Sequence, residues 1–275
     1  MEYDIILLNK KGDNRVNMDN EIKLTDGFID LKINENLLGF RNVHQKEYAI
    51  IRETKTLLDS MQSEFINQDA SKSEMYLVTA IIELNKLFQS AVVLFERGLL
   101  ESGNIIIRSC LELSFKIVEI IKNKNFVDDM IKELNHETIT TLNIIKSNKL
   151  YDIVPKLEVK RMLSIYNTAG TKPKISPFKL AKKNDLMREY ILYRLYCNDS
   201  HQSIATLSEI QIFEDNGVRL NGNLRLDKFS ESVYMLISII MIPFPTLIDE
   251  VFTDDKVKEQ YEKLKENFQN VFEKE

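Results

Sequence analysis

Residues 99–122 read LLESGNIIIRSCLELSFKIVEIIK, and their apolar side chains recur at the three- and four-residue spacing of an α-helix. At about 100° per residue, a stripe of about 60° along this helix carries four ionisable residues of alternating sign: Arg97, Glu101, Arg108 and Glu112. This stripe is either a solvated helix face with two surface ion pairs or the lining of a polar cavity inside a bundle. Gly98 and Gly103 either break the helix or let a second helix approach closely.

The same periodicity extends over most of the chain and predicts a mainly α, multi-helix bundle. Eight glycines and five prolines in 275 residues are few for a fold built on tight turns. We expect residues 1–38 to form an N-terminal arm with short strands, and residues 39–275 to form a single helical domain. A chain of this length can bury a substantial core.

Two segments carry the pattern of short strands. Residues 29–33 alternate apolar and polar side chains, which predicts an extended or β N-terminal arm. Ile210–Phe213 and Leu224–Leu226 flank the turn signals Asp215-Asn-Gly217 and Asn221-Gly-Asn223. They predict a small β-hairpin insertion near residues 210–226, with a looped excursion as the alternative.

The composition excludes several classes of site. Three histidines and two cysteines argue against zinc sites, disulfide frameworks and redox dithiols, so we expect no metal and no cofactor. A net charge of −5 does not fit a broad nucleic-acid-coating surface, although it allows a local basic patch. The first residues do not resemble a secretory signal, and the longest apolar run, residues 233–244, is shorter than a bilayer span. We therefore expect a cytoplasmic protein, not a membrane protein, with reduced thiols.

A second helix, expected over about residues 185–207, holds Arg194 and His201 seven residues apart. With Tyr190 at 0°, Arg194 falls at about 40° and His201 at about 20°, on the less polar side. An arginine and a histidine there need partners, because burying an unpaired charge is costly. The helix of residues 99–122 offers them. We predict one polar cluster, with a hydroxyl from Tyr190 or Tyr193, made of Arg97, Glu101, Arg108, Glu112, Arg194 and His201.

Such a cluster fits two functions. Histidine transfers protons near neutral pH and arginine stabilises phosphate charge, which together suit RNA cleavage without a metal. In that reaction the 2′-hydroxyl attacks the phosphate. The alternative is a buried network that fixes the register of the helices.

Lys179, Lys182 and Lys183, in a segment expected to be a loop, are either solvated or additional phosphate contacts.

The string Arg194-Leu-Tyr-Cys-Asn-Asp-Ser-His201 is similar to the Arg-x4–6-His motif of HEPN domains. These are helical proteins of bacterial toxin–antitoxin, CRISPR and phage-defence systems. Active members are metal-independent ribonucleases whose arginine and histidine meet across a dimer. The resemblance implies that Arg194 is a phosphate ligand and His201 the catalytic residue of a homodimer. It also implies an RNA substrate and an antitoxin or defence-system partner. Leu195 departs from the motif, in which a polar residue often follows the arginine.

The chain also resembles an uncharacterised bacterial helical family over roughly residues 75–250. That family has an Arg-Gly-x-x-Glu and Arg-Ser-x-x-Glu helix, followed much later by a helix with tyrosine and histidine eight residues apart. Here the pattern is carried by Arg97–Glu101, Arg108–Glu112 and Tyr193–His201. The likeness implies that the two helices form one site.

The leading hypothesis is therefore a HEPN-like endoribonuclease acting as a toxin or antiviral-defence effector. The alternative is a non-catalytic sensing or scaffold module whose Arg/Glu/His cluster is structural or binds an anion.

Overall fold

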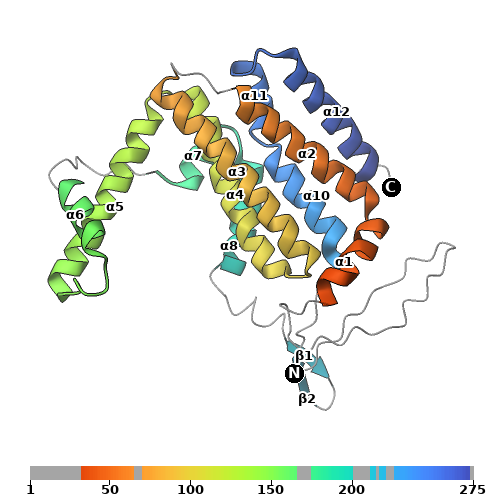
Figure 1. Cartoon of the computed structure of the whole chain (residues 1–275), viewed down its shortest axis with the longest axis horizontal. Coiled ribbons are helices and arrows are strands. Elements are labelled where there is room, and N and C mark those ends of the chain that lie inside the picture. The colour runs from red at the N-terminus through yellow and green to blue at the C-terminus, as the bar shows by residue number, and fades with distance from the viewer. Residues whose placement is uncertain are drawn as a thin grey trace.

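The segment of residues 99–122 forms helix α4 (Leu100–Lys122), which lies inside a bundle of helices (Figure 1). The computed structural model describes residues 32–64, 70–165, 175–200, 211–214, 217–220 and 226–272. The helices before α4 are α1 (Lys32–Val43), α2 (Gln45–Glu64) and α3 (Lys72–Glu96). Those after it are α5 (Phe126–Asn148), α6 (Lys156–Ile165), α7 (Pro177–Lys183), α8 (Met187–Ser200), α10 (Phe229–Ile240), α11 (Phe244–Glu250) and α12 (Asp255–Phe272). A short 3-10 helix, η2 (Leu226–Lys228), precedes α10. The predicted helical bundle is confirmed.

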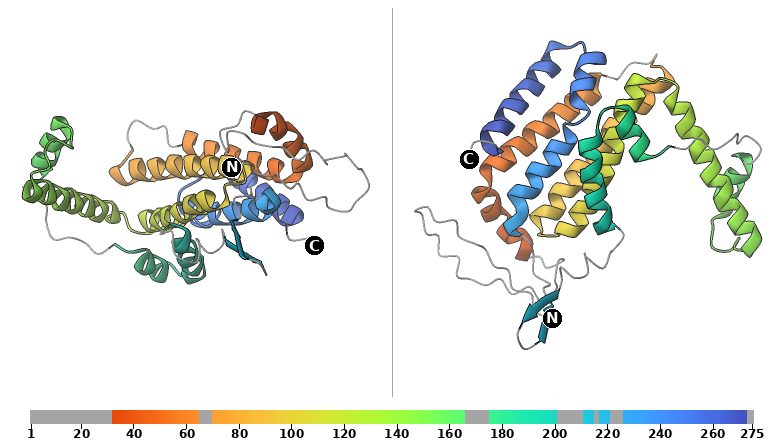
Figure 2. Two further views of the ribbon diagram at one scale, coloured as in Figure 1. Left: turned by 90° about the horizontal axis from the view of Figure 1, so that it is seen from below. Right: turned by 180° about the vertical axis from the view of Figure 1, so that it is seen from behind.

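The bundle has layers, with α4 in the middle of them. Helices α2 and α3 form one layer and pack on α10, which also contacts α4 (Figure 2). Helix α12 lies against α2, while α7 and α8 cover the other side of α4. Helix α4 is therefore buried between the bundle core and the α7–α8 pair, which explains why its apolar arc is so wide.

Local signals set the junction between α3 and α4. Ser71 and Glu74 form a capping box at the start of α3. Gly98 adopts a left-handed conformation with φ of 68° and separates the two helices. Gly103 lies where α4 meets the ring of Phe95, and a Cβ atom there would come within 2.1 Å of that ring. The two glycines thus have different tasks: Gly98 ends a helix, and Gly103 permits close packing.

Buried apolar residues from most of the helices form one continuous core. Its largest fully buried side chains include Phe88, Phe95, Phe115, Phe229 and Phe244. At roughly 25 cal/mol for each Å² of apolar surface removed from water, this burial is the main favourable contribution to folding.

The predicted fold class is wrong in its β part. Ile33, expected in a strand, lies in α1, and Leu226, expected in the second strand of a hairpin, begins η2. A two-stranded ladder does pair β1 (Gln211–Glu214) with β2 (Gly217–Leu220), four residues each. Wherever the structure describes side chains, however, every regular element is a helix. The fold is an all-helical bundle, because the apolar alternation near Ile33 is too short to outweigh docking of α1 on α2.

The predicted boundary between residues 38 and 39 falls inside α1, which runs on without interruption to Val43. Residues 1–31 lie outside the described residues, so the expected N-terminal arm stays a prediction.

Two segments, Lys72–Glu96 and Leu226–Glu250, are long and apolar enough to cross a membrane by length and composition. About half of each is buried inside the bundle, as in core helices, so this is weak evidence for a membrane protein. The cytoplasmic location stays a prediction.

Candidate functional site

Helices α4 and α8 meet through a polar contact centred on Arg108. The guanidinium donates from Nη2 to the Tyr193 hydroxyl oxygen at 3.0 Å and from Nε to the Cys197 Sγ at 3.3 Å. It also lies 5.1 Å from the centre of the Tyr193 ring, within the range of a cation–π interaction. The structure therefore joins two of the predicted cluster residues, Arg108 and Tyr193, across the two helices.

The tyrosine in this contact is buried. Burial raises the pKa of Tyr193, the Arg108 guanidinium opposes that rise, and the charges of Cys197 and Glu112 add to it. The net effect is a raised pKa for Tyr193, so its hydroxyl stays protonated at neutral pH. The hydroxyl oxygen accepts the hydrogen bond from Arg108. The arrangement holds a cation in a fixed place and leaves the Tyr193 proton available for a further acceptor.

Aromatic rings extend this contact toward α7. Tyr190 stacks on Tyr193 with ring centres 5.8 Å apart, and Phe178 of α7 meets the Tyr190 ring edge-on at 5.4 Å. Such pairs add stability beyond their buried area. Tyr190 is thus in the predicted cluster as a packing residue that fixes α7 on α8.

The other predicted residues of the stripe do not form one row. Arg97 is the C-cap of α3, and Gly98 turns the chain before α4 begins, so Arg97 does not share a helix with Arg108. Glu112 accepts a hydrogen bond from Lys116, one turn further along α4, at 3.0 Å. Glu101 is half-buried and has no ion pair with another described side chain.

Arg194 is exposed on α8, whereas the sequence placed it on a face that needed buried partners. Tyr193 and Cys197 take the side toward α4 instead. Arg194 has no ion pair with another described residue, so its charge faces solvent. His201 follows α8 in the sequence and lies outside the described residues.

The three predicted phosphate-contact lysines lie on α7, a short helix that the sequence led us to expect as loop. Ser176 caps this helix and Pro177 occupies its first turn. Lys183 forms an ion pair with Glu119, a carboxylate that is only 1% exposed. Lys179 and Lys182 are exposed. Lys183 is exposed as well, but its ammonium group is already paired with Glu119.

Glu119 is one of two buried carboxylates that the sequence analysis missed. It accepts hydrogen bonds from Lys183, from Asn184 at 3.1 Å and from Asn123 at 3.0 Å. Burial raises its pKa, but these hydrogen bonds outweigh that effect and the pKa falls below its ordinary value. The network ties α7 to α4. The sequence did carry a signal that Glu119 is buried. It lies four residues after Phe115 and eight after Leu111, on the buried face of α4.

The second is Glu96, at the end of α3. Arg41 of α1 donates to it from Nε at 3.0 Å, and Tyr48 of α2 donates its hydroxyl to the same carboxylate. Burial, together with the hydrogen bond to Glu96, raises the pKa of Tyr48. This network fastens α1 and α2 to α3.

A serine, a histidine and a glutamate also meet between α1, α2 and α10. Ser230 and Glu47 both approach Nδ1 of His44, at 3.4 Å and 3.3 Å, and Ser230 donates to Glu47. A catalytic triad needs the serine and the acid on opposite ring nitrogens. This cluster is therefore structural. In the part of the chain that the structure describes, no three metal-ligating side chains come together either.

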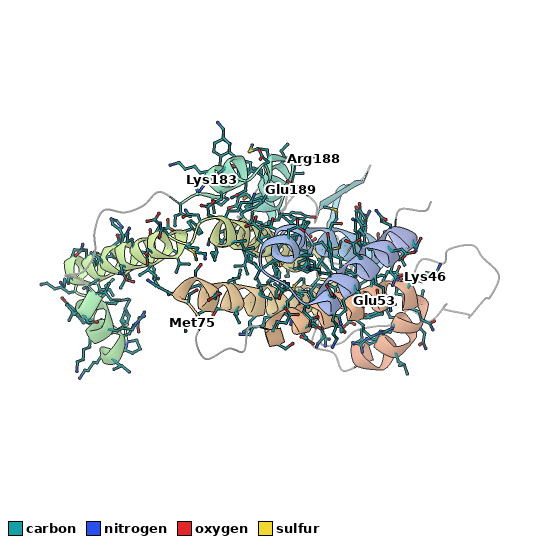
Figure 3. The ribbon with its side chains drawn as sticks, turned by 90° about the horizontal axis from the view of Figure 1, so that it is seen from above. Lys46, Glu53, Met75, Lys183, Arg188 and Glu189 are labelled. Atoms are coloured by element: carbon teal, nitrogen blue, oxygen red, sulfur yellow. The ribbon has the colours of Figure 1, made fainter. Side chains whose placement is uncertain are left out.

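The exposed surface around Arg194 belongs to the α7–α8 side of the molecule. Figure 3 shows Lys183, Arg188 and Glu189 on that side, with Lys46 and Glu53 of α2 on the opposite side. Arg194, Arg188, Lys179 and Lys182 are all exposed cations of these two helices. They do not share one face, because Arg188 and Arg194 lie about 120° apart around α8 and the exposed Asp185 lies between the two helices.

The fold and this site define a helical-bundle protein in which α8, held on α4 by Arg108, presents to solvent an arginine that no described carboxylate pairs with. The chain belongs to the family of unknown function DUF5677, which it matches over residues 74–218. The match includes both α4 and α8, the helices that carried the predicted likeness to an uncharacterised helical family. Comparison with curated proteins and with solved structures gives no match. Family membership names no activity and does not support the HEPN resemblance.

Proposed function

We propose that the protein is a metal-independent endoribonuclease, with Arg194 as phosphate ligand and His201 as proton-transfer residue. The observation that carries the proposal is the exposed guanidinium of Arg194, which no described carboxylate neutralises. Arginine without a protein partner suits bidentate recognition of a phosphate. The resemblance of residues 194–201 to the HEPN motif supplies the role of His201.

The opposite side of α8 supports this assignment. Arg108, Tyr193 and Cys197 fix the helix on α4, so Arg194 projects from a rigid element. Lys179, Lys182 and Arg188 add positive charge on the same two helices, which favours a polyanionic ligand.

Apolar side chains beside Arg194 favour a site shared by two chains. Met187, Ile191 and Leu195 recur every four residues along α8 and are all exposed, the last two at 60%. Exposed apolar rows of this kind mark contact surfaces. A second copy that covers this row would bring two Arg194 side chains together, so we propose a homodimer through α8.

The proposed reaction needs no bound water for its first step. His201 accepts the proton of the 2′-hydroxyl as its oxygen attacks the phosphorus. The bond to the 5′-oxygen breaks, and that oxygen takes up the proton held by the same His201, while Arg194 is supplied by the partner subunit. Arg194 stabilises the charge that develops on the phosphoryl oxygens. The products are a 2′,3′-cyclic phosphate and a 5′-hydroxyl.

RNA cleavage in excess EDTA tests the proposal. The wild-type chain should cleave RNA to cyclic-phosphate ends, and Arg194→Ala or His201→Ala should slow it about 100-fold or more. Arg52→Ala, a matched change at an exposed position of α2, should leave the rate unchanged. A wild-type chain without activity, or Arg194→Ala at the wild-type rate, would overturn it.

A role as toxin or phage-defence effector is a proposal that follows from the HEPN resemblance. Its test is growth arrest on expression, relieved by Arg194→Ala.

A non-catalytic scaffold is the second candidate, and one observation favours it. Arg108 and Glu112 of the predicted cluster already have partners, as in a structural network. If the cluster only stabilises the fold, Arg108→Met should lower the melting temperature of the protein. Neither the wild-type chain nor any variant of α8 should then cleave RNA.

A further inference from the structure

Helix α7 presents to solvent one aromatic ring among lysines. Its exposed positions fall within an arc of about 140° at 100° per residue: Phe178, Lys182, Lys179 and Lys183. We call these four residues the α7 face. The buried residues of the helix, Leu180 and Ala181, lie outside this arc, and α7 contains no acidic residue. Because Phe178 is 44% exposed, the α7 face offers a flat apolar ring and positive charge together.

Two of the three lysines are free to neutralise a ligand. The ammonium group of Lys183 is paired with Glu119. Among the described residues, neither Lys179 nor Lys182 has a carboxylate partner. The next acid along the chain, Asp185, lies beyond the end of α7. A ligand of the α7 face therefore gains from carrying negative charge.

The ring of Phe178 is supported from behind by other aromatic rings. It meets the Tyr190 ring edge-on with centres 5.4 Å apart, and Tyr190 in turn stacks on the buried Tyr193. The start of α7 is also fixed, because the Ser176 side chain accepts a hydrogen bond from the backbone N–H of Lys179. The ring therefore needs little ordering when a flat group stacks on its exposed side, which lowers the cost of binding.

The α7 face adjoins the proposed phosphate site. Arg194 follows Tyr190 by four residues on α8, which is about one turn and about 6 Å along the helix axis. The two positions differ by about 40° around α8, so they lie on the same side of the helix. Since Tyr190 carries the ring of Phe178, one chain of nucleotides can reach both Phe178 and Arg194.

We infer that the α7 face binds single-stranded RNA, with an unpaired base stacked on Phe178 and neighbouring phosphates on Lys179 and Lys182. Proteins bind single strands with exposed rings among cations, because every base has a flat face and every nucleotide a negative charge. A duplex does not fit, since neighbouring bases cover its base faces. The choice of RNA over DNA rests on the proposed ribonuclease function, whereas the stacking does not.

Phe178→Trp reports the stacking directly, because the chain has no tryptophan of its own. The full chain also carries His201→Ala, which keeps the RNA intact, and is titrated with oligo-uridine. The single strand should quench the tryptophan emission as a base stacks on the ring. The same strand in a duplex should not, and neither should inorganic polyphosphate, which has charge but no base. Tyr151→Trp, at an exposed aromatic position outside α7, is the matched reporter and should keep its emission with each probe.

The anisotropy of a labelled strand, measured in the same background, separates stacking from charge. Phe178→Ala should weaken binding about ten-fold or more, the effect of removing one base–aromatic stack. Lys179→Gln with Lys182→Gln should reduce the slope of log affinity against log salt by about 1.4, since each phosphate contact of a single strand contributes about 0.7. Tyr151→Ala and Lys256→Gln, exposed positions elsewhere, should bind RNA like the wild type.

RNA that binds without quenching Phe178→Trp, equal quenching by the duplex, or wild-type affinity in Phe178→Ala would each overturn the inference. A blue shift with vesicles of anionic lipid, and no response to RNA, would assign the α7 face to a membrane and overturn it too. Cleavage by the chain with His201 intact is scored separately. Cleavage without quenching overturns only this inference, and quenching without cleavage supports it while overturning the ribonuclease proposal.

Discussion

Glu47 links the stability of the fold to pH. Burial raises its pKa, but hydrogen bonds with His44 and Ser230 outweigh burial and hold the pKa at about 2. This pKa is below the ordinary value, so the charged carboxylate stabilises the native state. The full contribution is present at pH values above the pKa of the carboxyl in the unfolded chain. That contribution, on the order of 2–3 kcal/mol at neutral pH, is lost as the pH falls from about 5 toward 2.

We predict that Glu47→Gln flattens this acid dependence. Urea unfolding at pH 7 and at pH 3 should show a smaller loss of stability for the variant than for the wild type. Glu259→Gln, at an exposed position of α12, provides the matched control and should keep the wild-type dependence. Equal losses in wild type and Glu47→Gln would show that the Ser230 and His44 contacts do not lower the pKa of Glu47.

At the residue level, sequence periodicity predicted that Glu101, Arg108 and Glu112 share a helix, but it placed Arg97 there wrongly and did not show which way a helix faces. Arg108 and Tyr193 were expected in one cluster and do meet. Arg194 was expected to face the same neighbours and is exposed, because α8 carries apolar residues on every side. Its orientation is set by the contact of Tyr193 and Cys197 with Arg108, which links residues 85 and 89 positions apart.

At the scale of elements, the contact of α3 with α4 depends on Gly103. A Cβ atom there would lie 2.1 Å from Cε1 of Phe95, a ring that is fully buried. We predict that Gly103→Ala destabilises the protein by about 1–3 kcal/mol, as overpacking does in cores, despite the better helix propensity of alanine.

Phe95→Leu in the same chain should recover part of this loss, because the smaller side chain makes room for the methyl group. Chemical denaturation of the two single variants and the double variant gives the coupling between the positions. Strictly additive losses, or a stable Gly103→Ala variant, would contradict close packing at this point.

Element boundaries followed from local chemistry where that chemistry was strong. Gly98 and Gly103 were expected either to break the helix or to allow a close approach, and Gly98 does the first while Gly103 does the second. Helix α7 was missed, because its lysines resemble a solvated loop until Lys183 meets Glu119, 64 residues earlier in the chain. Long-range pairs of this kind have no local sequence signal.

At the scale of the whole molecule, the sequence predicted a single helical bundle, but not the projection of α5 and α6 from it (Figure 1). Leu142 and Leu134 are equally apolar in the sequence, yet one is buried and the other exposed. Which of the two leucines is buried depends on how α5 and α6 are arranged in space, and the local sequence does not show this. The same holds for Ile191 and Leu195, which are apolar but exposed on α8.

Complementation between two inactive variants tests the central claim, a ribonuclease site shared by two chains at α8. Arg194→Ala and His201→Ala are each mixed with RNA in EDTA, alone and after exchange of subunits in a 1:1 mixture. The account predicts that neither variant cleaves alone and that the mixture recovers about a quarter of the wild-type rate, since half of the dimers then hold one intact site. A mixture as inactive as its components, or activity in either variant alone, would contradict the account.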